Sequence, residues 1–325
     1  MIDSGCALRK FSEGLLSLYT TNQVTGTDDD AKKFLQVRDE VRTNAIVYRD
    51  RVLPLTERAV TQISNVMAYF SDLEFDDWAD NIMEHLDDVN KGMVILAYIQ
   101  LLHDSINTSL IESREKAKLA KIGMDRMHKK YAAVVQELEE RARKSRKTAA
   151  DARLWGSVFN FGGIGVAVGE YIAHGPSCEA DKIEAESTGK RENAELALRA
   201  VIITDKVLIA SVQDFLDGIE ACSKFLTFLK MKLGAVKNYG EKGRKMVWFK
   251  AMKKKSLEIQ KIAAYFVSMT NFMKNEINAI PEQVGDKNYV DWWVEKRKQE
   301  FEKNHKSTWE LICTDLREIW QTLLD

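Results

Sequence analysis

The side chains that most often do chemistry in proteins are present in this chain of 325 residues, but they do not stand in catalytic or metal-binding patterns. The sequence contains no HExxH zinc motif, no GxSxG nucleophile motif and no GxxxxGK[ST] phosphate-binding loop. The pairs Asp76-Asp77 and Asp87-Asp88 are typical of helix starts and surface charge. The five histidines are far apart in the sequence: His85, His103, His128, His174 and His305. We therefore expect no enzymatic activity, no metal site and no cofactor.

The four cysteines are also widely spaced and form no CxxC pair: Cys6, Cys178, Cys222 and Cys313. This spacing argues against a disulfide-dense framework and leaves one or two long-range disulfides open. Gly163, Gly165 and Gly169 form a loose version of the glycine fingerprint that binds dinucleotides. That fingerprint needs a preceding strand, a βαβ unit and an acidic residue about 20 positions later. Helical patterns flank these glycines on both sides, so a nucleotide-dependent enzyme is the less favoured interpretation.

The segment of residues 154–175 differs in composition from the rest of this highly charged chain. It contains one charged residue, Glu170, and six glycines. A helix of about 20 residues would span a bilayer core, but each glycine lowers helix propensity by up to about 1 kcal/mol relative to alanine. β-Branched and aromatic residues on both sides of Gly162-Gly163 favour a β-tongue instead. A helix or helical hairpin, and a buried connection between helices, are the alternatives.

This apolar segment is the best candidate for contact with a lipid membrane. We expect ten of its side chains to insert: Leu154, Trp155, Val158, Phe159, Phe161, Ile164, Val166, Val168, Tyr171 and Ile172. Arg146, Lys147 and Arg153 precede them, where they would meet lipid phosphates as the apolar part enters the bilayer. A second basic run at residues 242–255 surrounds aromatic residues. It is typical of a solvated helix face, although such a mixture also suits an anionic membrane or nucleic acid.

Long helices are predicted on both sides of the apolar segment. Apolar residues recur at steps of three and four in residues 2–19, which predicts a short amphipathic helix. Its apolar stripe consists of Leu8, Phe11, Leu15 and Leu18. Helical patterns continue from about 29 to 71, with a kink expected at Pro54, and from about 91 to 153. One further helix reaches about 280, and the last runs from about 289 to 323.

The strongest periodicity lies between residues 198 and 236. One seven-residue series reads Val201, Leu208, Phe215, Cys222, Leu229 and Val236. A second series reads Leu198, Asp205, Val212, Ile219, Leu226 and Leu233. Such a seam keeps one helix face against its partners over several turns, and Ile202, Ile209 and Leu216 widen it as in a multi-helix bundle.

These patterns predict an all-α fold. We expect an elongated bundle of long helices, formed by residues 1–153 and 176–325, with a small hydrophobic head at residues 154–175, either a β-tongue or a short helical hairpin. Lysine and arginine number 48 against 49 aspartate and glutamate, so no global positive charge favours nucleic acid, and we expect no nucleic acid partner. The N-terminus has no basic region followed by a long apolar run, so we expect no signal peptide here.

In these respects the chain resembles the α-helical pore-forming toxins of the cytolysin A type, a family that includes components of multi-component haemolysins and enterotoxins. The resemblance rests on a short N-terminal amphipathic helix, long bundle helices and the central stretch LWGSVFNFGGIGVAVGEYIA. It implies a secreted, soluble monomer whose residues 154–173 swing out of the bundle into a target-cell membrane. It further implies a homo-oligomer in which residues 2–19 line a pore, and a haemolytic, virulence-related activity, alone or with other toxin components.

One other class fits the sequence. A cytosolic membrane-associated helical bundle, such as a cell-death executioner or a membrane-curving scaffold, would also combine long amphipathic helices with a membrane-seeking segment. Such a protein would act from the cytosolic side of the membrane and would tubulate vesicles instead of making them permeable.

Overall fold

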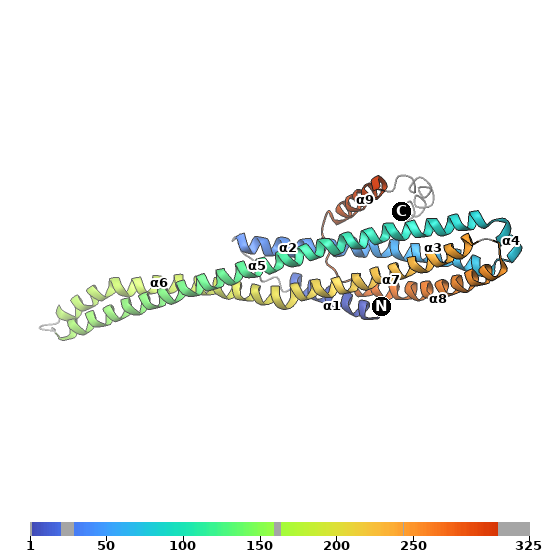
Figure 1. Cartoon of the computed structure of the whole chain (residues 1–325). Helices are drawn as coiled ribbons and strands as arrows, with labels where there is room; N and C mark the ends of the chain where they lie inside the picture. Colours follow the sequence, from blue (N-terminus) through green and yellow to red (C-terminus); the bar gives the residue numbers. More distant parts are fainter. Residues whose placement is uncertain (1, 21–28, 159–163, 243, 305–325) are drawn as a thin grey trace. The chain divides into compact units, whose positions relative to one another are not determined.

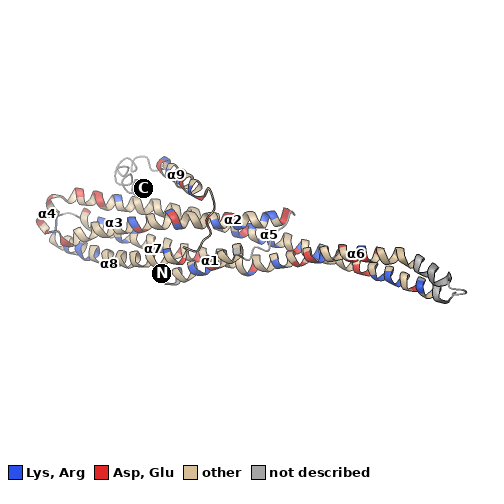
Figure 2. Ribbon diagram, turned by 180° about the vertical axis from the view of Figure 1, so that it is seen from behind, with Lys and Arg blue, Asp and Glu red and all other residues tan. Residues whose placement is uncertain are grey.

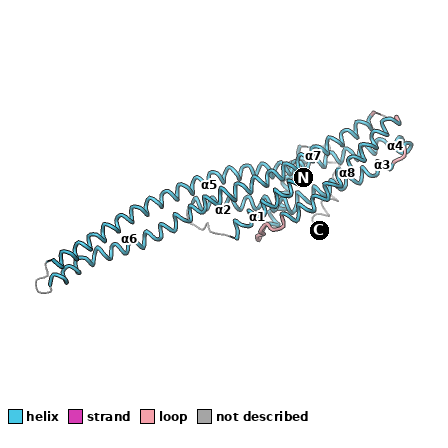
Figure 3. The backbone as a smooth tube through the Cα atoms, turned by 90° about the horizontal axis from the view of Figure 1, so that it is seen from below, coloured by secondary structure: helices cyan, strands magenta, loops and turns pink. Residues whose placement is uncertain are grey.

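Helices account for all regular secondary structure in the described part of the chain. The structure, a computed structural model, describes residues 2–20, 29–158, 164–242 and 244–304. Within these ranges the side chains of residues 2–4, 20, 152, 155–158 and 164–172 are not described. No strand occurs among the described residues, so the predicted all-α class is confirmed (Figures 1 and 3).

In chain order the elements are α1 (Ile2–Thr20), α2 (Asp29–Val47), η1 (Tyr48–Val52), α3 (Leu53–Asp72), α4 (Phe75–Asp80), α5 (Ile82–Val158), α6 (Ile164–Ile203), η2 (Thr204–Ile209), α7 (Ala210–Glu241), α8 (Met246–Glu276) and α9 (Asp286–Asn304). The two η elements are π-helical turns, and η1 stands where an irregularity was expected at Pro54. α1 agrees with the predicted N-terminal helix, whereas α5 is longer than predicted, at 77 residues. The predicted last helix is present as far as Asn304, and its remainder lies outside the described residues.

The chain divides into two compact units. Unit 1 consists of residues 1–21, 37–116 and 207–325, and unit 2 consists of residues 22–36 and 117–206. The elements α2, α5 and η2 therefore contribute residues to both units, and the expected head at residues 154–175 falls within unit 2.

In unit 1, α7 packs against α1 and α8, and α8 also packs against α3. The first predicted seven-residue series is buried at Leu208, Phe215, Cys222, Leu229 and Val236. Burying a leucine, valine or phenylalanine side chain stabilises a fold by about 1.5–3 kcal/mol. Aromatic stacking adds to this, because the ring centroids of Phe225 in α7 and Phe266 in α8 lie 4.2 Å apart. The predicted seam is thus the core of unit 1.

The second predicted series is wrong at Leu198, and Asp205 is the one charged residue that interrupts it. Leu198 is exposed, and the Asp205 carboxylate forms an ion pair with Lys121 at the surface of unit 2. The π-helical turn η2 contains Asp205 and places an extra residue in one turn, which rotates the buried face of the helix. The series holds beyond this turn, where its buried members are Val212, Ile219, Leu226 and Leu233.

Two arginines fasten the loop between α8 and α9 in unit 1. The Arg42 guanidinium donates to both carboxylate oxygens of Asp286, at 2.7 and 2.8 Å, and lowers the pKa of that carboxyl. Arg49 donates to the Ile280 carbonyl at 3.3 Å and forms an ion pair with Glu282. Both arginine side chains are nearly buried, so these paired charges hold the loop in one geometry.

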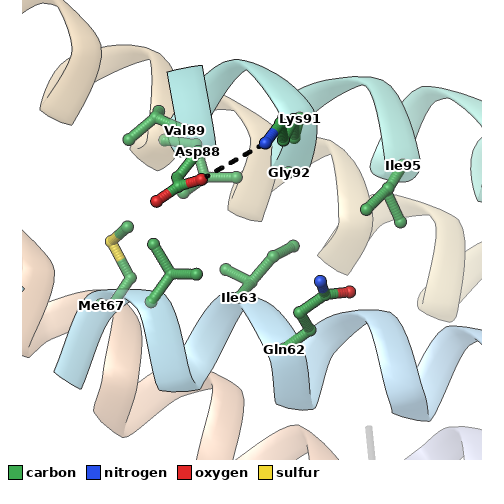
Figure 4. A pocket seen from close by; sticks show the side chains of 10 residues that line it. Gln62, Ile63, Met67, Asp88, Val89, Lys91, Gly92 and Ile95 are labelled. Atoms are coloured by element: carbon green, nitrogen blue, oxygen red, sulfur yellow. Dashed lines mark ion pairs between the residues drawn. The ribbon is translucent and has the colours of Figure 1, made fainter. Parts of the chain in front are cut away.

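A small cavity lies between α3, α5 and α7 in unit 1 (Figure 4). Its volume is about 40 Å³, and Gly92, Ile63 and Leu233 form part of its wall. Pockets that bind small molecules measure roughly 300–1,000 Å³, so this cavity has no room for a nucleotide or another ligand of that size. A Cβ atom on Gly92 would lie 3.5 Å from Ile63 Cγ1 and 3.7 Å from Leu233 Cδ1, which are ordinary contact distances.

Replacing Gly92 by alanine should raise the free energy of unfolding by about 1 kcal/mol. The methyl group would occupy free space, and alanine avoids the entropy cost of a glycine inside a helix. Gly240→Ala is the matched control, because its Cβ would lie 2.5 Å from Leu86 Cδ2 and force that side chain to move. Urea denaturation followed by circular dichroism measures both variants. A less stable Gly92→Ala protein would contradict the packing at the cavity.

Candidate functional site

The predicted membrane-inserting segment joins the end of α5 to the start of α6 in unit 2. Its backbone is helical at residues 154–158 and 164–175, so the favoured β-tongue is wrong for these residues. They form the two arms of the alternative, a helical hairpin (Figure 3). Each arm extends a long helix that is already nucleated, so further residues join it at little cost even where glycine lowers the propensity.

The ten predicted membrane-inserting residues divide between the end of α5, the start of α6 and the part of the chain that the structure does not describe. Leu154, Trp155 and Val158 end α5, and Leu154 is 65% exposed. Five others lie at the start of α6: Ile164, Val166, Val168, Tyr171 and Ile172. Phe159 and Phe161 lie outside the described residues. Eight of the ten residues thus lie at the ends of two helices that follow each other in the chain. Of these eight, only the Leu154 side chain is described.

Small side chains form a seam between the arms of the hairpin. On α6 the buried residues Ala173, Ala180, Ser187 and Ala194 recur every seven positions. On α5 the buried residues Val135, Ala142 and Ala149 recur at the same interval. This seam was missed in the sequence, although it extends the Val201 series upstream in steps of seven. Alanine and serine contribute too little hydrophobicity for the periodicity to stand out.

Ion pairs cross the hairpin on its solvent-exposed sides. Arg146 on α5 pairs with Glu184 on α6, and Arg191 on α6 pairs with Glu139 on α5. All three predicted headgroup contacts, Arg146, Lys147 and Arg153, are exposed on α5. The acidic residues around Glu184 are part of α6.

The hairpin is therefore held by weak interactions. Buried alanines contribute much less apolar area than leucine or phenylalanine, and each exposed ion pair adds at most about 1 kcal/mol. Segments of this kind open locally at low free-energy cost. The apolar segment thus lies at the end of an element that can rearrange without unfolding unit 1.

The predicted pore-lining helix α1 lies in the core of unit 1, packed against α7 and α8. Its whole apolar stripe is buried: Leu8, Phe11, Leu15 and Leu18. The ring of Phe11 stacks on that of Phe215 in α7, with centroids 4.2 Å apart. The helix comes very close to α7 at Gly14, where a Cβ atom would lie 3.1 Å from the Cβ of Ser211.

Polar contacts hold both parts of α1 in place. The Arg9 guanidinium forms an ion pair with Glu276 of α8 at 2.8 Å. Near the end of the helix, the Tyr19 hydroxyl donates to the Asp39 carboxylate, and the Arg38 guanidinium lies 4.1 Å from the centre of the Tyr19 ring. The Glu276 and Arg38 side chains are only 9% and 11% exposed, so these contacts hold α1 together with the burial of its stripe.

A chain of ring contacts leads from α1 to a buried histidine in unit 1. Phe215 touches Phe11 on one side and Tyr48 on the other, and the Tyr48 ring lies edge-on to His103, with centroids 5.5 Å apart. His103 Nε2 lies 3.1 Å from the Thr56 hydroxyl, which donates its hydrogen to the Val52 carbonyl. His103 Nε2 must therefore carry the proton and donate to Thr56.

Neither metal binding nor disulfide bonding is indicated in the described part of the chain. Cys6, Cys178 and Cys222 are free thiols there, and no group of histidine, cysteine and acidic residues could hold a metal ion. One described helical stretch, Ile82–Asp151 of α5, is long and apolar enough to cross a membrane, but 44% of its most apolar window is buried. A core helix of a soluble protein meets the same criteria.

No protein-family model and no curated protein matches the chain. Solved structures do match it. The AhlB pore of the tripartite α-pore-forming toxin AHL from Aeromonas hydrophila is 12% identical, with a TM-score of 0.66, over 83% of this chain and 99% of AhlB. The pre-pore form of AhlB is 14% identical, with a TM-score of 0.56, over 86% of this chain and 95% of AhlB.

XaxA from Xenorhabdus nematophila is also similar, with 8% identity and a TM-score of 0.55 over 84% of this chain and 97% of XaxA. At these low identities the matches establish the fold. The chain has the helical-bundle fold found in α-pore-forming toxins, and the resemblance seen in its sequence is confirmed at that level.

Acid should destabilise unit 1 through His103. Burial lowers the pKa of His103 from 6.5 to about 3, so between these pH values the unfolded chain binds a proton that the folded chain does not. Stability should therefore fall as pH falls below 6.5, by about 1.4 kcal/mol per pH unit. Urea denaturation at about pH 7.5 and pH 5.5 measures this loss.

The control is His103→Gln, whose side-chain amide keeps a donor for Thr56 but does not titrate. It should lose clearly less stability than the parent over the same pH interval, in which most carboxyl groups stay ionised. Equal losses in the two proteins would show that His103 is not the group responsible.

Proposed function

We propose that this chain is a pore-forming cytolysin. A soluble monomer inserts the segment 154–173 into a target membrane and assembles with further copies into a helical pore, alone or as one component of a multi-component toxin. The observation that best supports this proposal is the similarity of fold to AhlB over nearly the whole length of that protein. The structure of AhlB is known both as a pre-pore and as a pore. Secretion precedes this step, and lipid and other copies of the chain are the partners.

The weakly held hairpin supports the first step of this mechanism. An apolar segment of this length must be covered in water, since an exposed patch of that size promotes aggregation. In lipid its backbone polar groups must all be paired, which a helix achieves within itself. The helical arms at 154–158 and 164–175 already satisfy most of that requirement. Insertion would therefore need movement of helices and little new secondary structure.

The buried stripe of α1 supports the second step. Releasing Leu8, Phe11 and Leu15 from the core of unit 1 would cost about 1.5–3 kcal/mol for each side chain. An isolated helix in water would leave these side chains exposed, so nothing would offset that free-energy cost. Contacts with lipid and with neighbouring copies must offset it, so release of α1 is coupled to membrane binding and assembly.

The apolar segment should be tested with charges. Phe161→Asp together with Ile164→Asp would place two carboxylates in hydrocarbon, at a cost of about 3 kcal/mol each near the centre of a bilayer. We expect the double variant to fold normally and to lose dye release from liposomes by at least about tenfold. Leu119→Asp with Ile122→Asp is the matched control, because both residues are exposed on α5 outside the segment. Dye release equal to that of the parent in the first variant would exclude the segment from membrane insertion.

Release of α1 should be tested with a reversible lock. Gly14→Cys and Ser211→Cys bring two Cβ atoms to about the separation that a disulfide needs, at 3.1 Å before adjustment. Cys6, Cys178 and Cys313 are replaced by serine to prevent exchange. The oxidised protein should bind liposomes without releasing dye, and reduction should restore release. The oxidised Ser211→Cys single variant controls for oxidation itself, and full release by the locked form would show that α1 stays on α7 in the active state.

A further inference from the structure

An acidic face covers one part of unit 1 around α4. Residues 71–90 contain eight carboxylates and neither lysine nor arginine. We call its exposed members the acidic face: Asp72, Glu74, Asp76, Asp77, Asp80 and Glu84. Met83 lies among them and is 76% exposed. None of these six carboxylates forms an ion pair among the described residues. Figure 2 marks aspartate and glutamate in red on the ribbon around α4.

A basic face lies at the start of α8 in the same unit. Residues 242–255 contain seven lysines and arginines and no carboxylate. We call four of its exposed members the basic face: Arg244, Lys245, Lys250 and Lys254. Lys242 is exposed too, but its ammonium lies over the Trp248 ring, 4.5 Å from the ring centre. Val247 stands between them and is 62% exposed, and Met246 is 46% exposed.

The two faces adjoin through an aromatic contact but do not neutralise each other. Phe249 of α8 packs against Phe75 and Trp78 of α4, with centroids 5.5 and 5.3 Å away. Phe249 and Trp78 are buried, whereas Lys250 and Lys254 are exposed on α8 and their charges cannot share the buried side. Asp77 and its acidic neighbours likewise flank Trp78 and are exposed. Among the described residues, no ion pair joins one face to the other.

Like charges grouped on one face repel each other, and an opposite charge from outside relieves this repulsion. An anionic lipid surface would attract the basic face but repel the acidic face directly beside it. Further copies of the chain satisfy both faces, one copy at the acidic face and another at the basic face. The exposed apolar side chains Met83 and Val247 would then be covered as well, which is the usual composition of a protein–protein contact.

We propose that the acidic face of one copy binds the basic face of a second copy. The contact uses different surfaces on the two partners, so it is heterologous and can repeat around a closed ring. The inference rests on the proposed function in that it names the contact through which copies assemble on the membrane.

Charge reversal tests the contact. The acid variant carries D76K, D77K and D80K, and the basic variant carries K245E, K250E and K254E. Each triple variant should lower oligomer formation on liposomes by at least about tenfold, because the two faces that meet then carry charges of the same sign. A chain with all six substitutions should recover, and so should an equal mixture of the two triple variants. A carbodiimide, which links carboxylates directly to lysines in contact, detects the oligomers and maps the linked peptides.

Controls separate the contact from folding and from overall charge. Circular dichroism should show that all variants stay folded, since every substituted side chain is exposed. Thermal unfolding should show a small loss in the acid variant and in the six-substitution chain, because Asp76 and Asp77 lie in the first turn of α4. The variant with R126E, K129E and K130E changes the net charge as much as the basic variant but lies in unit 2, and it should assemble normally. Salt at about 1 M shortens the screening length to about 3 Å and should weaken cross-linking in the parent.

The possible outcomes distinguish this contact from the proposed function. Cross-links between the two faces without dye release would retain the contact and contradict pore formation. Dye release that neither triple variant alters, or a parent without oligomers, would overturn the contact. A six-substitution chain as inactive as the triple variants would also overturn it. Loss of binding to anionic but not zwitterionic vesicles, confined to the basic variant, would assign that face to lipid headgroups and equally overturn it.

Discussion

The burial of the α1 stripe against α7 and α8 is the interaction on which the rest of unit 1 depends. Phe11 covers Phe215, which covers Tyr48 and through it His103. The Tyr48 hydroxyl is buried beside Cys222, whose sulfur is a weak acceptor, and His103 Nδ1 is buried without a hydrogen-bond partner among the described residues. A buried polar atom of this kind costs about 1–3 kcal/mol. Removing α1 would expose apolar surface, but it would also bring water closer to these atoms, so the ring cluster reduces the net cost of releasing the helix.

The two units are stabilised in different ways. Unit 1 buries leucine, phenylalanine and tryptophan side chains and fixes its α8–α9 loop with the nearly buried arginines Arg42 and Arg49. The hairpin of unit 2 buries mainly alanine and carries its ion pairs in solvent. Unit 1 thus holds the amphipathic helix whose apolar stripe is buried, and unit 2 carries the apolar segment that we propose to enter the membrane. This division suits a protein that changes its solvent without unfolding as a whole.

Much of the fold could be predicted because it depends on local periodicity. The α7 seam from Leu208 to Val236 and the stripe of α1 were both found from spacing alone, and both are buried. The β-tongue was wrong because residues beside Gly162-Gly163 have strand-like side chains, while the flanking helices decide the backbone conformation. The prediction that Leu198 is buried was wrong because a π-helical turn changes the register of the buried positions, and the sequence carries no sign of that turn. The approach of Gly14 to Ser211 joins residues far apart in the chain, so no local pattern could show it.

The alanine seam of the hairpin has one more consequence. Large side chains of different shape fit their neighbours in a single alignment. The α6 side of this seam instead repeats a side chain of nearly the same small size every seven residues, at Ala173, Ala180, Ser187 and Ala194. Sliding α6 along α5 by one heptad, about 10.5 Å, would again set small residues opposite small residues. A seam of such uniform side chains therefore specifies the alignment of the two helices less strictly than a core of large side chains does. The ion pairs Arg146–Glu184 and Arg191–Glu139, which a slide of one heptad would break, then distinguish the observed alignment from its neighbours.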